Sequence, residues 1–329
     1  MHNRVWNRAR IGMAAAVALA GFGASAHAQD KVWRHGLIKA KADAGIFMMV
    51  STRDFAKKQG LDLQVSQFRN DQIELKALLA GQLDSFEGGP QGVFAADQRG
   101  ADVRILGCHW VVLPHGIYAK DSIKKVSDLK GKTIAVSAPN SMPDMLARFA
   151  LQKYHVDPSN VKLAAVGGDH DRYNALVSGV VDAAVVSNEV EPVMPKSLHL
   201  LLAGREAMPM FVRDCIMTSQ KVLDTKGKEA AHFLAAEMNA LHFALTHEAE
   251  TVALTKKLIN AKPNDPRPAF VYNDAVKHHE VDDTIPLPKD KLEWLQNQLV
   301  KIGKLKKPLD LSKVTAPQVR EQALKMTGM

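Results

Sequence analysis

The sequence predicts an α/β protein of two lobes, each built around its own sheet. From Lys31 to about Leu202, short apolar runs alternate with amphipathic helical patterns. This alternation is typical of parallel strands joined by right-handed helical crossovers. A polar connector, Asp121–Lys130, separates two such series, so two sheets are expected. After about Cys215 apolar residues recur at helical spacing, which predicts a helical final third.

The first series predicts strands that alternate with helices. The strands are expected at Val32–Ile38, Leu61–Phe68, Leu83–Phe86, Val103–Gly107 and Gly116–Lys120. The helices are expected at Gly45–Lys58, Asp71–Ala80 and Gln91–Arg99. The glycines and prolines between these runs mark the turns.

The second series repeats the pattern. Its strands are expected at Thr133–Ser137, Val161–Val166, Val180–Val186 and Leu198–Leu202, and its helices at Pro143–Lys153 and Asp169–Ser178. In the final third, two apolar stripes are expected to face a core: Ala230, Leu234, Met238, Leu241 and Leu245, then Leu292, Leu295, Leu299 and Ile302.

Residues 1–28 have the pattern of a secretory signal peptide. Arg4, Arg8 and Arg10 provide a basic start, an apolar stretch follows, and Ala26-His27-Ala28 has the small-x-small pattern of a cleavage site. The apolar stretch is short for a membrane span and glycines interrupt it. The mature chain is therefore expected to begin at Gln29 and to work outside the cytoplasm.

The composition excludes several classes of function. The 46% hydrophobic and 24% charged residues are typical of a globular protein, and the net charge of +8 is scattered rather than striped. Nucleic acid is not expected as a partner. The two cysteines have no metal-ligand spacing, and no metal or cofactor is expected. The motifs GxSxG, HExxH and the P-loop do not occur, so an enzyme is not expected.

Several segments resemble one family of transport proteins. They are Phe55–Val65 (FAKKQGLDLQV), Leu78–Asp84 (LLAGQLD), Gly88–Pro90, Ser127–Val136 (SDLKGKTIAV) and Ser187–Pro192 (SNEVEP). The chain is similar to the periplasmic solute-binding proteins of ABC importers, in the nitrate/sulfonate/taurine branch. That branch shares its domain with the thiamine-pyrimidine synthases, whose cysteine cluster is absent here.

The resemblance implies a type II periplasmic-binding-protein fold, with two Rossmann-like lobes, a hinge and a helical C-terminal extension. Two segments, Tyr118–Asp121 and Phe211–Cys215, are expected to cross between the lobes. Lobe 1 would comprise residues 29–119 and 214–329, and lobe 2 residues 120–213. The resemblance also places Cys108 and Cys215 on neighbouring strands, where they would form a disulfide or remain two buried thiols.

A monomeric, periplasmic binding protein is the function that the resemblance implies. It would capture a small solute by closure of its lobes and deliver it to an ABC permease and its ATPase. A ligand-sensing exported receptor subunit is the alternative partner role. An enzyme like the thiamine-pyrimidine synthases is the alternative activity, and export makes it the weaker one.

Ligand-binding residues are sought just after the strands, because ligands in open α/β sheets lie beyond the carboxyl ends of the strands. In lobe 1, Asp43 either caps a helix or faces the cleft. Glu87 and Gly88 end a strand beside a second glycine, where the backbone can approach a ligand. His109 offers a hydrogen bond, and Trp110 either stacks on a planar ligand or fills the core.

In lobe 2 the candidates are Ser137, Asn140 and Ser141, which open a helix, and Asn188 and Glu189, which follow a strand. Ser141 is also a helix cap by its spacing to Asp144.

Carboxylates crowd this predicted rim: Asp43, Glu87, Asp144, Asp169 and Glu189. The main basic residues there are Arg172, Lys39 and Lys41. Buried carboxylates beside an anion are unfavourable, so the rim predicts a planar ligand that carries amines or amides, such as an aminopyrimidine. A sulfonate, nitrate or carboxylate is the alternative.

Overall fold

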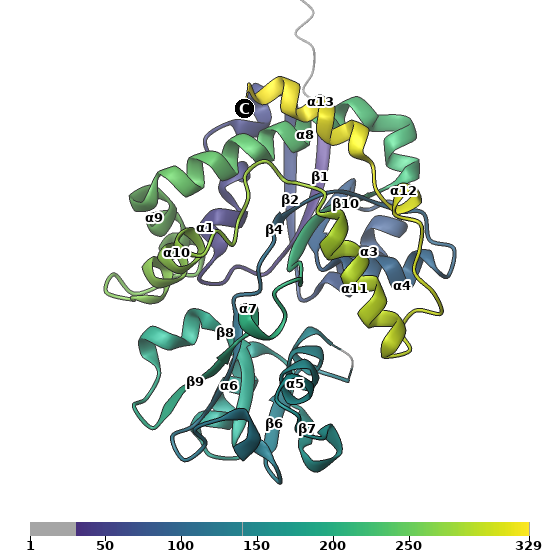
Figure 1. The fold of residues 1–329 in the computed structure, drawn as a ribbon. Coiled ribbons are helices and arrows are strands. Elements are labelled where there is room, and N and C mark those ends of the chain that lie inside the picture. The colour runs from purple at the N-terminus through teal and green to yellow at the C-terminus, as the bar shows by residue number, and fades with distance from the viewer. Residues whose placement is uncertain (1–30, 140, 329) are drawn as a thin grey trace, which may run out of the picture.

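Two five-stranded sheets organise the chain, one in each half of the molecule (Figure 1). The computed structural model describes residues 31–139 and 141–328. The expected signal peptide and the candidate Asn140 lie outside these residues. The α/β class predicted from the sequence is confirmed.

The first sheet has the order β2-β1-β3-β10-β4. Its strands are β1 (Lys31–Ile38), β2 (Leu61–Phe68), β3 (Ser85–Gly88), β4 (Val103–Trp110) and β10 (Asp214–Ser219). The second sheet has the order β7-β6-β8-β5-β9. Its strands are β5 (His115–Lys120), β6 (Thr133–Val136), β7 (Lys162–Ala165), β8 (Ala183–Ser187) and β9 (Leu198–Ala203).

Both sheets are mixed rather than wholly parallel. β10 runs antiparallel to β3 and β4, and β5 runs antiparallel to β8 and β9. Each of these strands enters its sheet from the other half of the molecule, so its direction is opposite to that of its neighbours. The parallel arrangement expected from the βα alternation holds for the remaining pairs β1–β2, β1–β3, β6–β7 and β6–β8.

The chain crosses between the sheets twice. Because β5 belongs to the second sheet, the first crossing is residues 111–114, earlier than the expected Tyr118–Asp121. β5 therefore belongs to the second lobe, although its residues 115–119 were expected in lobe 1. The second crossing, residues 204–213, contains α7 (Gly204–Ala207) and only its end overlaps the expected segment. Below, the first and second lobes mean each sheet with the helices that pack on it.

Helices flank both sheets. In order they are α1 (Ala44–Phe47), α2 (Phe55–Lys58), α3 (Asp71–Leu79), α4 (Pro90–Asp97), α5 (Met142–Lys153) and α6 (Asp169–Val177). Short 3-10 turns lie at Met49–Ser51, Val126–Leu129, Pro158–Asn160 and Asn188–Val193. The single helix predicted over Gly45–Lys58 is wrong. Arg53 and Asp54 have positive φ angles of 51° and 58°, which a right-handed helix cannot contain.

The final third is helical, as predicted. It consists of α8 (Gln220–Thr246), α9 (Glu248–Leu258), α10 (Arg267–Lys277), α11 (Lys289–Lys301), α12 (Leu311–Val314) and α13 (Pro317–Thr327). α8 and α13 lie over the first sheet (Figure 1). α8 buries an apolar face there, which includes Phe233, Leu234 and Met238.

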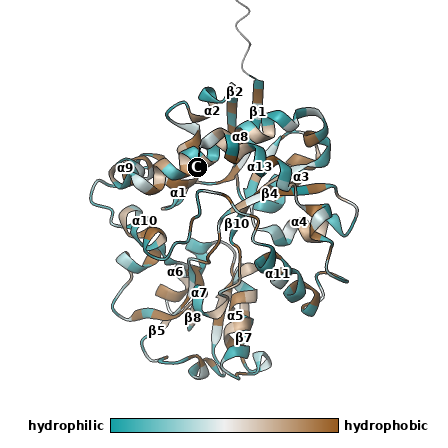
Figure 2. Ribbon diagram, turned by 45° about the horizontal axis from the view of Figure 1, so that its top comes forward, coloured by the Kyte–Doolittle hydropathy of each residue, from teal (hydrophilic) through white to brown (hydrophobic). Residues whose placement is uncertain are grey.

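Surface helices such as α8 and α13 carry hydrophilic residues interspersed with hydrophobic ones (Figure 2). Within residues 31–139 and 141–328, no helix combines the length and apolar character needed to cross a bilayer.

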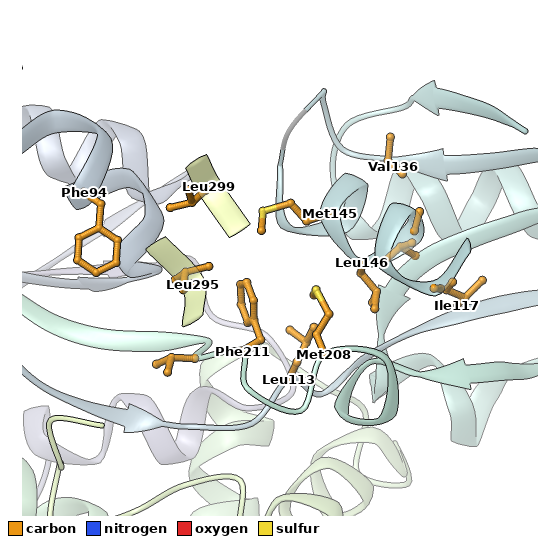
Figure 3. Close-up of a cluster of buried hydrophobic side chains, with 14 of the residues drawn as sticks. Phe94, Leu113, Ile117, Val136, Met145, Leu146, Met208, Phe211, Leu295 and Leu299 are labelled. Atoms are coloured by element: carbon orange, nitrogen blue, oxygen red, sulfur yellow. The ribbon is translucent and has the colours of Figure 1, made fainter. Parts of the chain in front are cut away.

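One apolar core continues from the first lobe into the second (Figure 3). Phe94 and Leu295 contribute from the first lobe, and Met145 and Leu146 from the second. Side chains of both crossings, including Leu113, Met208 and Phe211, fill the space between them. α11 also reaches the second lobe, since the rings of Trp294 and Phe149 lie 5.6 Å apart. We call this region the apolar seam.

A disulfide joins Cys108 on β4 to Cys215 on β10. The two residues are direct partners in the antiparallel pair, with Cα atoms 3.7 Å apart. Of the two alternatives that the sequence left open, the structure has the bridge.

Candidate functional site

A pocket lies at the carboxyl ends of β1 and β3, where sequence reasoning placed a ligand. Its volume is about 50 Å³, which is room for a few water molecules. Its wall comes from the segment after β1, from the end of β3 and from the start of β10. The lining residues are Leu37, Ile38, Lys39, Ala40, Lys41, Asp43, Ala44, Phe47, Met48, Glu87, Arg213 and Asp214.

Arg213 is the main cation of the pocket wall. Its guanidinium donates to Asp43 at 2.5 Å and lies 3.0 Å from the carboxylate of Asp214. It also lies 4.1 Å from the ring centre of Trp110, within cation–π range. Its Nη1 atom is buried and has no hydrogen-bond partner among the described residues. One donor of the guanidinium is therefore not used by the described residues.

Asp43 faces the pocket rather than capping a helix. It occupies the N-cap position of α1, but its side chain makes no capping hydrogen bond and pairs with Arg213. Of the two interpretations of Asp43, the geometry favours the cleft.

Glu87 lies at the pocket floor between two histidines. Its carboxylate oxygens are 3.4 Å from His35 Nε2 and 3.1 Å from His109 Nε2. Burial by itself would raise the pKa of Glu87, but the adjacent His109 and His35 lower this pKa to about 2. Glu87 is therefore an anion at neutral pH. His109 is buried and contacts Glu87 rather than lining the pocket.

Trp110 belongs to the core. Its side chain is fully buried, stacks on Phe47 at 5.0 Å and donates from Nε1 to Glu280 at 3.2 Å. Phe47 and Arg213 line the pocket, whereas Trp110 does not. The expectation that Trp110 stacks on a planar ligand is therefore not met, and the core interpretation holds in this structure.

Gly88 also serves packing in this structure. A Cβ at this position would lie 2.9 Å from the Cβ of Asp71 on α3. The missing side chain lets α3 approach β3, and Gly88 does not line the pocket.

The second lobe touches the first beside the pocket. Glu189 accepts a hydrogen bond from the backbone N–H of Ala42 at 3.2 Å, and Asn188 donates to Asp274 of α10 at 2.7 Å. Lys41 lies 2.9 Å from Asp169 of α6. These three contacts, which we call the polar latch, join the lobes on the side of α1 and α10.

The helix start at Ser141 is confirmed. The Ser141 hydroxyl accepts from the backbone N–H of Asp144 and donates to the carbonyl of Ala138. Neither Ser137 nor Ser141 lines the pocket.

Most carboxylates of the predicted acidic rim have a cationic partner. Asp43 pairs with Arg213, and Asp169 pairs with Lys41 and Arg172. Asp144 pairs with Arg148 one helical turn later. The rim is therefore paired in large part, which weakens the argument for an amine-bearing ligand.

Sequence reasoning missed Arg213, Lys41 and Phe47. Arg213 precedes a strand instead of following one, so a search at strand ends passes over it. Lys41 was noted as a basic residue of the rim but not as a contact between the lobes.

Comparisons with known proteins agree with this architecture. The chain is 24% identical over 287 residues to a Brucella abortus protein named as a binding protein, covering 84% of this chain and 88% of that one. The periplasmic aliphatic sulphonate binding protein SsuA from Escherichia coli superposes with a TM-score of 0.72 at 17% identity, covering 86% of this chain and 97% of that chain.

The fold also occurs in an enzyme. The desulfurization enzyme DszB superposes with a TM-score of 0.69 at 15% identity, covering 90% of this chain and 99% of that chain. The fold alone therefore does not separate binders from enzymes.

Residues 42–251 match the profile of the NMT1/THI5-like family. This match covers both crossings, the whole second lobe and the part of the pocket wall from Asp43 onward, whereas the lining residues 37–41 precede it. The chain therefore belongs to the NMT1/THI5-like family.

Proposed function

We propose that this protein is the extracytoplasmic substrate-binding component of an ABC importer. It captures a small solute between its lobes and delivers it to a membrane permease and its ATPase. The secretory pattern of residues 1–28, the binding-protein names of its relatives and the two-lobed fold support this assignment.

The observation that carries the proposal is the contrast between the two sides of the contact between the lobes. On one side, the apolar seam of Phe94, Met145 and Phe211 continues from lobe to lobe. On the other side, the polar latch consists of one ion pair and two hydrogen bonds. Opening the latch exchanges polar contacts for water, which has a small net free-energy cost. Opening the seam would expose apolar surface.

A hinge at the seam and an opening at the latch follow from this contrast. The pocket lies beside the latch, because Lys41 contributes to both. Opening the latch therefore exposes the pocket, and closing it traps the solute, as in hinge-type binding proteins.

For the ligand we propose an organic acid, with a sulfonate or carboxylate group on Arg213. Arg213 pairs with Asp43 and Asp214, and its Nη1 still has no hydrogen-bond partner among the described residues. An unsatisfied donor on a buried cation is a strong site for an acidic group. The small volume of the pocket suits such a group better than a ring.

The test is a thermal-shift and calorimetric screen of the mature chain with sulfonates, nitrate, carboxylates and aminopyrimidines. We expect an acid to raise the melting temperature, because it binds only the folded state. Arg213→Gln should abolish this rise. Arg104→Gln, which removes an arginine paired with Asp102 and outside the pocket lining, should preserve it.

A rise with aminopyrimidines alone would contradict the acid assignment and restore the amine-bearing ligand. No rise across the panel would contradict capture of these solutes.

A further inference from the structure

Two histidines and two glutamates are buried together beneath the floor of the pocket. They are His35 on β1, Glu87 on β3, His109 on β4 and Glu237 on α8, each at most 3% exposed. We call them the His–Glu cluster. Only Glu87 also lines the pocket, so the cluster is a separate feature of the first lobe.

Glu237 is an acidic residue on an otherwise apolar stretch of its helix face. It lies on the buried face of α8, between the apolar residues Leu234 and Leu241. Phe233, one turn earlier, packs against the ring of His35 at 4.7 Å and so brings α8 onto β1 at this point. A carboxyl group buried in such a face is unfavourable unless it is paired, protonated or bound to a metal.

The donor atoms of the cluster converge. One potential ligand atom from each of His35, Glu87 and Glu237 lies within 4.8 Å of the other two. His35 Nε2 is 3.4 Å from Glu87 Oε1. Two ligands about 2.0–2.1 Å from a tetrahedral zinc ion are about 3.4 Å apart. The pair therefore has the spacing of two atoms that share one ion.

The ring of His35 is also oriented by a contact on its other nitrogen, Nδ1. Its Nδ1 lies 2.7 Å from the hydroxyl of Ser85, and that hydroxyl oxygen accepts a hydrogen bond from Trp33 Nε1 at 2.8 Å. A hydrogen bond on one ring nitrogen fixes the ring and directs the other nitrogen to a metal, as is usual for histidine ligands.

Glu237 Oε1 and His109 Nδ1 have no hydrogen-bond partner among the described residues, and His35 Nε2 has only its 3.4 Å contact with Glu87. Buried polar atoms without partners are rare and each typically costs about 1–3 kcal/mol. Glu87 and Glu237 are two buried carboxyl groups that converge with one histidine ring, and a bound cation would compensate the charge of both.

We propose that His35, Glu87 and Glu237 bind a divalent first-row transition-metal ion, Zn²⁺ above all, with His109 as a further donor beside Glu87. Mixed imidazole and carboxylate donors suit such ions, whereas Ca²⁺ and Mg²⁺ prefer oxygen donors alone. Because Glu87 faces both the cluster and the pocket, the ion would fix the pocket floor. This proposal does not depend on the identity of the solute.

The test uses the tag-free mature chain, freed of metal with a chelator and dialysed. Zinc is titrated in by calorimetry and counted by mass spectrometry after desalting. We expect one Zn²⁺ per chain. Glu237→Gln and His35→Gln should each lower the affinity by more than about a hundredfold, and Ser85→Ala by about 10–100-fold.

The matched control is His242→Gln. His242 is an exposed histidine 2.8 Å from Asp283, so it reports adventitious zinc on the surface. This variant should retain the stoichiometric zinc. The proposal is overturned if zinc is lost on desalting, if His242→Gln abolishes its binding, or if Glu237→Gln and His35→Gln both bind like the wild type.

A second measurement covers variants that fold poorly. Co²⁺ added to the wild-type protein should give the visible absorption of a protein-bound ion, which one equivalent of Zn²⁺ abolishes. Absence of that absorption would also overturn the proposal. Repeating the solute screen in the presence of a chelator separates the two proposals. Solute binding by the metal-free protein would support the proposed function whether or not the protein binds zinc.

Discussion

The ammonium of Lys41, in the segment after β1, lies 2.9 Å from the carboxylate of Asp169 at the start of α6. The two residues belong to different lobes. Burial by itself would raise the pKa of Asp169, yet Lys41, His115 and Arg172 hold this pKa well below its usual range. Asp169 is therefore ionised at neutral pH, and the pair links the lobes beside the pocket.

Lys41→Met should favour the open form. Hydrogen bonds to charged groups contribute about 1.5–3 kcal/mol, so we expect solute affinity to fall about tenfold or more and the radius of gyration in X-ray scattering to rise. The control is Lys120→Met, which removes an ion pair with Asp182 inside the second lobe. Equal effects of the two variants would show that the latch has no special role.

Glu74→Gln should change how stability depends on pH. Burial, together with the charge of Asp71, raises the pKa of Glu74 to about 9. The folded protein thus keeps a proton that the unfolded chain releases above about pH 4.5, so stability falls as the pH rises from about 4.5 towards 9.

Glu74→Gln has no carboxyl group to titrate at this position, so its free energy of unfolding should not fall in this way. At pH 7 it should exceed that of the wild type by up to about 3 kcal/mol. Urea unfolding at pH 5 and pH 7 measures the difference. Glu293→Gln, at an exposed position on α11, should show the same pH dependence of stability as the wild type. A glutamine variant whose stability falls as steeply as that of the wild type would disprove the assignment.

Replacing both Cys108 and Cys215 by serine should destabilise the first lobe. The bridge closes a loop that contains the whole second lobe, with 107 residues of separation. Loss of such a bridge typically costs about 2–5 kcal/mol. Urea unfolding with and without dithiothreitol should show sensitivity to the reductant in the wild type and none in the variant. A wild type that is indifferent to reductant would argue against the bridge.

Gly45→Ala should weaken both stability and solute binding. A Cβ at Gly45 would lie 2.2 Å from the backbone oxygen of Thr251 on α9. α1 must therefore shift, by overpacking that typically costs about 1–3 kcal/mol, and the shift moves Asp43 and Phe47 in the pocket wall. Gly92→Ala on α4, where a Cβ meets no atom, should be neutral or stabilising. If Gly45→Ala binds solute normally, the pocket wall does not depend on this contact.

Much of the fold could be predicted from local patterns. The alternation of strands and helices is a local property, because burial of one face imposes a period of 2 or 3.6 residues on each element. The helix start at Ser141 follows from capping chemistry within one turn. The position of Asp43 and Glu87 at the pocket follows from a general rule about strand ends.

The pairing of charges could not be predicted in this way. Arg213 pairs with Asp43 from 170 residues away, and this pairing weakens the reason for expecting an amine-bearing ligand. The place of Trp110 at a strand end predicted that its ring could stack on a ligand. In the folded protein, Phe47 and Arg213 lie against that ring instead.

The sequence by itself determined the α/β class, the two series of elements, the helical final third and the secretory pattern of the first residues, because each depends on neighbours along the chain. Only the tertiary structure decided which carboxylates are neutralised, that Glu237 meets His35 and Glu87, and where the lobes join. These features depend on contacts between segments that are distant along the chain. A buried charge is stabilised or destabilised by whichever residue the fold brings beside it.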